Sequence, residues 1–124
     1  MVTRPVIAII DDDDNVRTSL DSLLRSYGYS VHLFADAERF LASGILASFD
    51  CIVSDIQMPG MNGLQMYQRV LSQEHAIPVI FITASADDAP RLAAAQLGAC
   101  CYLSKPFDGE SLIDCLSLAL TSRD

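Results

Sequence analysis

The sequence predicts an α/β protein built on a five-stranded, doubly wound parallel sheet with helices on both faces. Three observations support this fold class. Short apolar runs alternate with helix-like segments five times along the chain, and the connections between them are short. Most of the runs are apolar throughout, as in strands buried on both faces. The chain has 124 residues and is 51% hydrophobic, which is enough for the core of one domain spanning residues 1–124.

The predicted strands are short and end at polar residues. The first apolar run leads into four consecutive aspartates, and the third leads into Asp55. The second run alternates between apolar and polar residues, which indicates a half-buried strand. In chain order, the predicted strands are Pro5–Ile10, Tyr29–Phe34, Cys51–Ser54, Pro78–Ile82 and Cys100–Leu103.

A segment with apolar residues at helical spacing follows each strand. Candidate N-caps are Asp14, Asp36 and either Asp87 or Asp88, and Gly28 and Gly98 are suitable stops. Pro59-Gly60 and Asn62-Gly63 mark a loop before the third helix, and Pro90 is tolerated in the first turn of the fourth. The inward-facing positions are Val16, Leu20, Leu23, Leu24 and Tyr27; Phe40 and Leu41; Leu64, Tyr67, Val70 and Leu71; and Leu112, Cys115, Leu116, Ala119 and Leu120.

Charge and hydropathy exclude several classes of function. The net charge of −8 should repel nucleic acid and anionic membranes, which clustered lysine and arginine would attract. No apolar run approaches the roughly 18 residues of a membrane span. The first residues lack the apolar region and cleavage site of a signal peptide, so we expect a cytoplasmic protein.

The four cysteines are expected to be small buried side chains in a reducing compartment. They are Cys51, Cys100, Cys101 and Cys115, each in an apolar segment and without a CxxC pair. His32 and His75 are far from them in sequence, so a zinc site is not expected.

Polar residues follow four of the predicted strands. Asp11 and Asp12 follow the first, Asp55 the third, Thr83 the fourth and Lys105 the fifth. In a parallel sheet these positions lie at one edge, the carboxyl end, where open α/β sheets bind ligands. We therefore expect three carboxylates, a hydroxyl and an ammonium group to meet in one cleft.

This combination of groups predicts magnesium-dependent phosphoryl chemistry. Two unit negative charges at 4 Å repel by roughly 4 kcal/mol at an effective dielectric near 20, so three crowded acids favour a cation among them. Carboxylate oxygens suit a hard divalent ion, and Mg²⁺ is the common cellular choice. A carboxylate can also accept a phosphoryl group as a nucleophile. Lys105 and the Thr83 hydroxyl would then hold the phosphoryl oxygens.

From Val6 to about Leu120, the chain resembles the receiver domain of two-component response regulators, and most closely FixJ-like receivers. The resemblance implies the flavodoxin-like (βα)5 fold with strand order 2-1-3-4-5. The segments that carry it are Ile9–Asp12, Val53–Gly63, Phe81–Ala84 and Tyr102–Phe107, together with Asp88-Ala89-Pro90.

The resemblance also implies a role for each matching residue. Asp55 would accept the phosphoryl group, and Thr83 and Lys105 would bind it. Asp12 and Asp55 would ligate Mg²⁺ directly, with Asp11 acting largely through water and the backbone carbonyl of Gln57 completing the protein ligands. Thr83 and Tyr102 would form the switch, the aromatic ring turning inward as Thr83 moves toward the phosphate.

The implied partners are a sensor histidine kinase and an output domain. FixJ-like receivers usually precede a helix-turn-helix DNA-binding domain, which would place this chain in transcription regulation. Activation is expected to change the face formed by the fourth helix, fifth strand and fifth helix, producing a homodimer or releasing the output. Such a domain is a phosphoryl acceptor with slow autodephosphorylation and not a turnover enzyme.

Three alternatives remain open at this stage. A small phosphotransferase of the haloacid-dehalogenase type would use Asp12, because Asp12-x-Asp14-x-Val16 fits its pattern; no acid pair follows Lys105, however, and Asp55 would be idle. A flavodoxin-like FMN binder would need glycine and hydroxyl residues where this chain has acids. The third alternative is a stand-alone receiver-like scaffold that acts by protein–protein interaction.

Overall fold

Five parallel strands form one sheet in the order β2-β1-β3-β4-β5. The computed structural model describes residues 4–121. In chain order the elements are β1 (Val6–Ile10), α1 (Asp14–Ser26), β2 (Ser30–Phe34), α2 (Ala37–Leu41), a 3-10 turn (Leu46–Ser48), β3 (Cys51–Asp55), α3 (Gly63–Ser72), β4 (Val79–Thr83), α4 (Asp88–Gln96), β5 (Cys101–Ser104) and α5 (Gly109–Thr121). The predicted fold class and the implied strand order are therefore confirmed.

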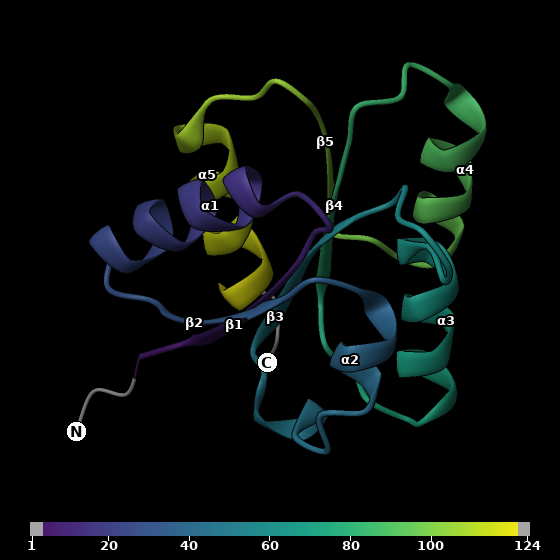
Figure 1. Cartoon of the computed structure of the whole chain (residues 1–124), viewed down its shortest axis with the longest axis horizontal. Coiled ribbons are helices and arrows are strands. Elements are labelled where there is room, and N and C mark those ends of the chain that lie inside the picture. The colour runs from purple at the N-terminus through teal and green to yellow at the C-terminus, as the bar shows by residue number, and fades with distance from the viewer. Residues whose placement is uncertain (1–3, 122–124) are drawn as a thin grey trace.

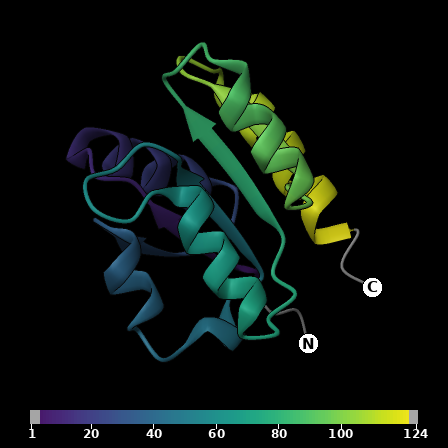
Figure 2. The same cartoon turned by 90° about the vertical axis from the view of Figure 1, so that its right-hand side faces the viewer.

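The helices cover the sheet in two layers, with α1 and α5 on one face and α2, α3 and α4 on the other (Figure 1). Figure 2 turns the second face toward the viewer, with α3 and α4 in front of the sheet. The central strands β3 and β4 are buried along their whole length, as the apolar runs predict. The longest helices have 13 residues, and no helix in the described range is both long and apolar enough to cross a membrane.

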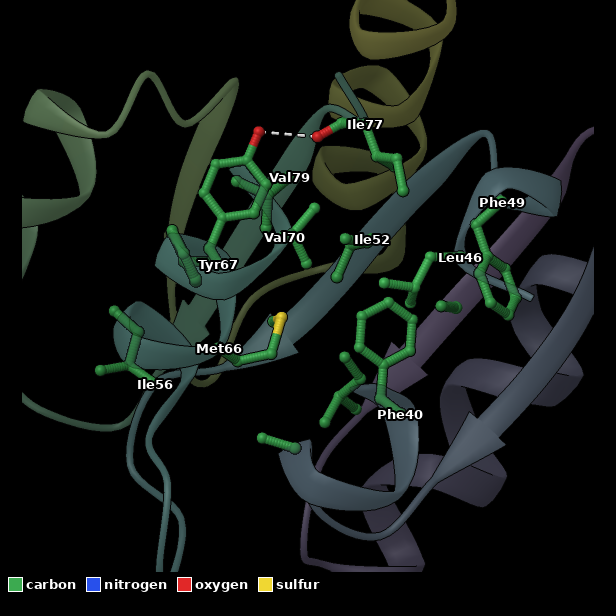
Figure 3. Close-up of a cluster of buried hydrophobic side chains, with 14 of the residues drawn as sticks. Phe40, Leu46, Phe49, Ile52, Ile56, Met66, Tyr67, Val70, Ile77 and Val79 are labelled. Atoms are coloured by element: carbon green, nitrogen blue, oxygen red, sulfur yellow. Dashed lines mark hydrogen bonds between the residues drawn. The ribbon is translucent and has the colours of Figure 1, made fainter. Parts of the chain in front are cut away.

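The larger core cluster lies between the sheet and α2, α3 and α4 (Figure 3). Phe40 and Phe49 pack with their ring centroids 5.5 Å apart. Tyr67 points into the same cluster, and its hydroxyl donates a 2.6 Å hydrogen bond to the backbone carbonyl of Ile77. This bond satisfies a carbonyl just before β4, so the aromatic ring can be buried without an unsatisfied polar group.

Helix starts follow the expected capping chemistry, with one correction. Asp13, not Asp14, is the N-cap of α1: its carboxylate accepts hydrogen bonds from the backbone N–H groups of Asn15 and Val16. Asp14 is the first helical residue, where its negative charge interacts favourably with the positive end of the helix dipole. Asp36 caps α2 as predicted.

Two of the residues predicted to face inward are exposed. Tyr27 is the C-cap of α1, where the backbone leaves the helix and the helical stripe no longer applies. In α3 the buried residues are Gly63, Met66, Tyr67 and Val70. Leu71 follows Val70 and is rotated about 100° around the helix axis, toward solvent.

The expectation of four reduced, buried cysteines is wrong for two of them. Cys101 in β5 and Cys115 in α5 form a disulfide, with their Cα atoms 6.1 Å apart. Cys51 is buried and Cys100 is half-buried. Nothing in the sequence spacing indicated this pairing, because it depends on how α5 packs against the edge strand β5.

Candidate functional site

The polar residues predicted to meet do lie at the carboxyl edge of the sheet. Asp11 directly follows β1, Asp55 is the last residue of β3, Thr83 is the last residue of β4, and Lys105 directly follows β5. The strand pairing aligns these ends, because Asp55 is level with Ile82 and Thr83 is level with Ser104. The parallel register therefore brings residues from four strands to one edge of the sheet.

Asp11, Asp12 and Asp55 form one acidic cluster. Each offers a carboxylate oxygen, and these oxygens all lie within 4.8 Å of one another. Asp11 and Asp55 are buried, whereas Asp12 is exposed. Within residues 4–121 this is the only such group of acidic, histidine or cysteine side chains.

Lys105 supplies the positive charge of the cluster. Its Nζ donates hydrogen bonds to Oδ2 of Asp11 at 3.0 Å and to Oδ2 of Asp55 at 3.3 Å. Its backbone N–H donates to the carbonyl of Thr83 at 2.7 Å, which ties the lysine to the end of β4. The Lys105 side chain is 21% exposed, so water screens these ion pairs only in part.

Burial and charge change the pKa values of both partners. Burial raises the pKa of Asp55, and the Asp11 carboxylate raises it further; the charge of Lys105 and two hydrogen bonds oppose this but do not cancel it. Burial alone would lower the pKa of Lys105, but the hydrogen bond to Asp11 and the charges of Asp55 and Asp11 outweigh it and raise that pKa. Burial and the Asp11 carboxylate therefore both disfavour the ionised form of Asp55, and Lys105 compensates for them only in part.

The donor atoms of this cluster fit a metal ion. Three carboxylates that share a single ammonium group leave a local excess of negative charge, and oxygen donors are the ligands that hard divalent cations prefer. The exposed position of Asp12 leaves the site open to solvent on one side. The acidic cluster is thus consistent with a metal site.

Thr83 and Tyr102 lie on the adjacent strands β4 and β5, with Tyr102 level with Phe81, two residues before Thr83. The Thr83 hydroxyl is buried and accepts a hydrogen bond from the backbone N–H of Ser85 at 3.1 Å. Tyr102 packs against the α2–α3–α4 core cluster, and its buried hydroxyl has no hydrogen-bond partner among the described residues. The guanidinium carbon of Arg91 in α4 lies 5.4 Å from the centre of the Tyr102 ring.

The loop between β3 and α3 contains structural features that the sequence analysis missed. The Asn62 side chain and Gln65 form a reciprocal capping box at the start of α3. Gly63 approaches the chain so closely that a Cβ on it would lie 2.3 Å from the carbonyl oxygen of Asp55. The Asn62-Gly63 pair indicated only a turn, although its glycine is required by contact with the site residue itself.

Two side chains that the sequence analysis did not single out form hydrogen bonds with the loops next to the site. Glu38 accepts a hydrogen bond from the backbone N–H of Met61 at 3.3 Å and so contacts the loop after Asp55. Arg17 donates a hydrogen bond to the backbone carbonyl of Asp11 at 2.6 Å. Neither contact has a sequence signal, because each joins a helix to a loop through a backbone atom.

Comparison with protein families matches residues 7–117 to the response regulator receiver domain. The transcriptional regulatory protein FixJ of Bradyrhizobium diazoefficiens is 38% identical over 120 residues, covering 97% of this chain and 58% of that protein. The response regulator protein TodT of Pseudomonas putida is 36% identical over 115 residues, covering 93% of this chain and 51% of that protein. The chain thus spans about half the length of these curated relatives.

The fold also matches solved structures. The crystal structure titled FixJ-N superposes with a TM-score of 0.89 at 28% identity, covering 99% of this chain and 98% of that chain. The superposition therefore spans almost the whole of both chains.

Proposed function

The chain belongs to the response regulator receiver domain family, and we propose that Asp55 accepts a phosphoryl group from a sensor histidine kinase. One observation carries the proposal. The Asp55 carboxylate is buried at the ligand-binding edge of the sheet, 3.3 Å from the Lys105 ammonium and within 4.8 Å of two further carboxylates. A carboxylate in such a setting can act as a nucleophile toward phosphorus.

The transfer step uses groups that this chain supplies. A carboxylate oxygen of Asp55 attacks the phosphorus of a phosphohistidine; the new P–O bond forms as the P–N bond breaks, and the leaving imidazole nitrogen takes up a proton. Lys105 and the Thr83 hydroxyl bind the phosphoryl oxygens and stabilise the negative charge that spreads over them in the transition state. The product is an acyl phosphate on Asp55, so the domain is an acceptor and not a turnover enzyme.

Mg²⁺ is the proposed cation of the acidic cluster. Asp12, Asp55 and the backbone carbonyl of Gln57 would ligate it directly. Asp11 would act largely through water, because Oδ2 of Asp11 is bonded to Lys105 and Oδ1 accepts the backbone N–H of Asp13. Such an ion supplies positive charge that favours the ionised form of Asp55 and attracts phosphoryl oxygens.

The proposed acceptor can be tested by chemical phosphorylation. Acetyl phosphate and Mg²⁺ should add the mass of one phosphoryl group to the wild-type protein and none to Asp55→Asn. Peptide mapping after reduction with borohydride should locate the modified residue at Asp55. A label on Asp12 would contradict the proposal and support the haloacid-dehalogenase-type alternative.

Thr83 and Tyr102 are the proposed switch residues. The Thr83 hydroxyl can exchange its contact with Ser85 for one with the phosphoryl group, and this difference in contacts shifts the equilibrium between two conformations. Tyr102 lies on β5, the strand adjacent to β4, and is level with Phe81, two residues before Thr83. Its hydroxyl is buried and has no hydrogen-bond partner among the described residues, so its ring position should respond to movement at the end of β4.

The face formed by α4, β5 and α5 is the proposed output surface. It carries two exposed leucines, Leu92 on α4 and Leu118 on α5. We expect beryllofluoride, a mimic of the phosphoryl group, to shift the protein from monomer to dimer in sedimentation velocity, and Leu92→Glu to weaken that dimer. An unchanged sedimentation coefficient would contradict the dimer and leave release of an output domain as the mechanism.

The histidine kinase is proposed to dock at an apolar groove next to Asp55. The groove lies between the start of α1 and the loop before α5, and Lys105 lines it as well as the acidic site. A partner seated there would bring its phosphohistidine close to the acceptor carboxylate. The apolar lining consists of Val16, Leu20, Leu23, Pro106 and Phe107.

The proposed output is transcription, acting through a DNA-binding domain outside these 124 residues. Support comes from the names of the relatives, which include transcriptional regulatory proteins of which the matched region covers only 58% and 54%. The net charge of −8 argues against DNA binding by the receiver itself. A kinase partner of this kind also implies a cytoplasmic location.

A further inference from the structure

Arg17 lies in the first turn of α1 and contacts the loop of residues 11–13 between β1 and α1, which we call the acidic loop. Its Nη1 donates a 2.6 Å hydrogen bond to the backbone carbonyl of Asp11, and its Nη2 forms an ion pair with the Asp14 carboxylate. The Arg17 side chain is only 15% exposed, whereas the Asp14 side chain is 87% exposed. A long cationic side chain is therefore packed against the loop and does not extend into solvent.

Asp11 is the residue on which the geometry of this loop depends. Its backbone N–H donates to the Phe34 carbonyl at 3.1 Å, and its two carboxylate oxygens are held by the Asp13 N–H and by Lys105. The Asp11 carbonyl is the last polar group of this residue, and Arg17 satisfies it. Because the next residue is Asp12, the position of that carbonyl sets the direction in which the chain presents the Asp12 carboxylate.

From these contacts we propose that Arg17 is a positioning residue for the cation site. By holding the Asp11 carbonyl, Arg17 keeps the loop in the conformation in which the carboxylates of Asp11 and Asp12 converge with that of Asp55. Arg17 has no contact with the phosphoryl-accepting carboxylate and acts through the loop alone. The inference rests on the proposed function, because it concerns affinity for the divalent cation that this function requires.

Electrostatics favours the same arrangement. Residues 11 to 14 are four consecutive aspartates, and their mutual repulsion opposes the approach of Asp11 and Asp12 to Asp55. Lys105 offsets this repulsion on the Asp55 side of the cluster. Arg17 offsets it at the opposite end, through Asp14 and the Asp11 carbonyl, and its planar guanidinium can serve both contacts at once.

The competing view is that Arg17 merely stabilises α1. The same helix provides a matched control in Arg25, whose Nε pairs with the Asp21 carboxylate at 2.6 Å and whose Nη2 donates to the Val31 carbonyl at 3.0 Å. Both arginines therefore combine an ion pair within one turn of α1 with a hydrogen bond to a backbone carbonyl outside the helix. Only the carbonyl bound by Arg17 belongs to the acidic loop.

The test compares Arg17→Gln with Arg25→Gln. Denaturant unfolding in EDTA measures stability, and isothermal titration calorimetry with MgCl₂ measures the dissociation constant of the folded protein. We expect both variants to lose stability, but only Arg17→Gln to bind Mg²⁺ more weakly, by about tenfold, as for other residues that orient metal ligands. Arg25→Gln should retain the wild-type dissociation constant.

Four outcomes would overturn the inference. The first is wild-type affinity in Arg17→Gln, and the second is an equal loss of affinity in Arg25→Gln. The third applies if Arg17→Gln does not fold, and it is unchanged binding in Arg17→Lys: an ammonium group cannot make both contacts of the guanidinium, so weaker binding is expected. The fourth is a wild-type protein that binds no Mg²⁺, which would also refute the proposed magnesium site and is thus distinct from the other three.

Discussion

Lys105 and Asp55 are 50 residues apart in the sequence, yet the lysine Nζ lies 3.3 Å from the aspartate Oδ2. The same ammonium group also contacts Asp11 at 3.0 Å, so it bridges the ends of β1 and β3 from its position after β5. This bridge leaves the buried site with one positive charge beside three carboxylates. Several consequences of that imbalance can be measured.

Removing the Lys105 charge should slow phosphorylation. We expect Lys105→Met to react with acetyl phosphate about 10²-fold more slowly than wild type, the scale on which loss of one stabilising donor acts in other group transfers. The rate is followed by intact mass. Lys105 is the only lysine in the chain, so acetylation by an amine reagent should cause a similar loss without mutation. A wild-type rate in both proteins would contradict the role assigned to this ammonium group.

Asp55→Asn should stabilise the metal-free protein at neutral pH. The pKa of Asp55 is raised in the folded state above its ordinary value of 3.8, so the folded state holds this proton more tightly than the unfolded state does. The resulting stabilisation is complete below pH 3.8 and is lost as the pH rises through the raised pKa. Asparagine mimics the neutral carboxyl group and should avoid that loss.

The measurement is the melting temperature in EDTA at several pH values. The advantage of Asp55→Asn over wild type should be smallest in acid and should increase toward neutral pH. A variant that is less stable than wild type at neutral pH would show that the pairing of Asp55 with Lys105 outweighs the cost of burial.

Asp12→Asn should remove the stabilisation by Mg²⁺ without harming the fold. Asp12 is exposed, so its substitution leaves the core intact. Ligand that binds only the native state stabilises it by about 2.7 kcal/mol at a hundredfold excess over the dissociation constant. Millimolar MgCl₂ should therefore raise the melting temperature of wild type and have little effect on Asp12→Asn. An equal rise in both proteins would place the cation elsewhere.

Gly63→Ala should destabilise the protein and disturb Asp55. A Cβ at Gly63 would lie 2.3 Å from the Asp55 carbonyl oxygen and 3.1 Å from the Ile56 Cα, and neither backbone atom can move freely. Overpacking of this kind costs about 1–3 kcal/mol, which urea unfolding can detect. The phosphorylation rate should fall as well, because the backbone of Asp55, the proposed acceptor, is displaced.

Gly109→Ala is the matched control for this substitution. Gly109 is the first residue of α5, as Gly63 is of α3, and a Cβ there would meet only the side chain of Leu23, at 3.1 Å. That flexible side chain can shift, so the loss of stability should be much smaller. Equal losses in the two variants would mean that the contact with Asp55 is not the cause.

Tyr67→Phe should reduce stability by about 1–3 kcal/mol, because the buried carbonyl of Ile77 loses its hydrogen-bond donor. The ring itself, shown in Figure 3, stays apolar and well packed, so phosphorylation of Asp55 should be unaffected. Tyr27→Phe is the control, since Tyr27 is 53% exposed. Urea unfolding distinguishes the two, and equal effects would contradict a specific contribution from the Tyr67 hydroxyl.

The sequence by itself determined the fold class and most of the site. Fully apolar runs are required where strands are covered on both faces, and polar residues at the ends of parallel strands must meet at one edge. For this reason Asp11, Asp55, Thr83 and Lys105 could be placed together although they are far apart in the chain. The sequence also predicted where the helices begin, except that the N-cap of α1 is Asp13 and not Asp14.

Other features were decided only by the tertiary structure. The disulfide between Cys101 and Cys115 depends on the packing of α5 against β5, and the need for glycine at position 63 depends on how closely α3 approaches β3. The contact of Arg17 with the Asp11 carbonyl depends on how α1 lies over the loop. A sequence pattern records which side chains alternate and repeat, but it carries no information on which backbone atom a side chain or another segment will approach once the helices have packed.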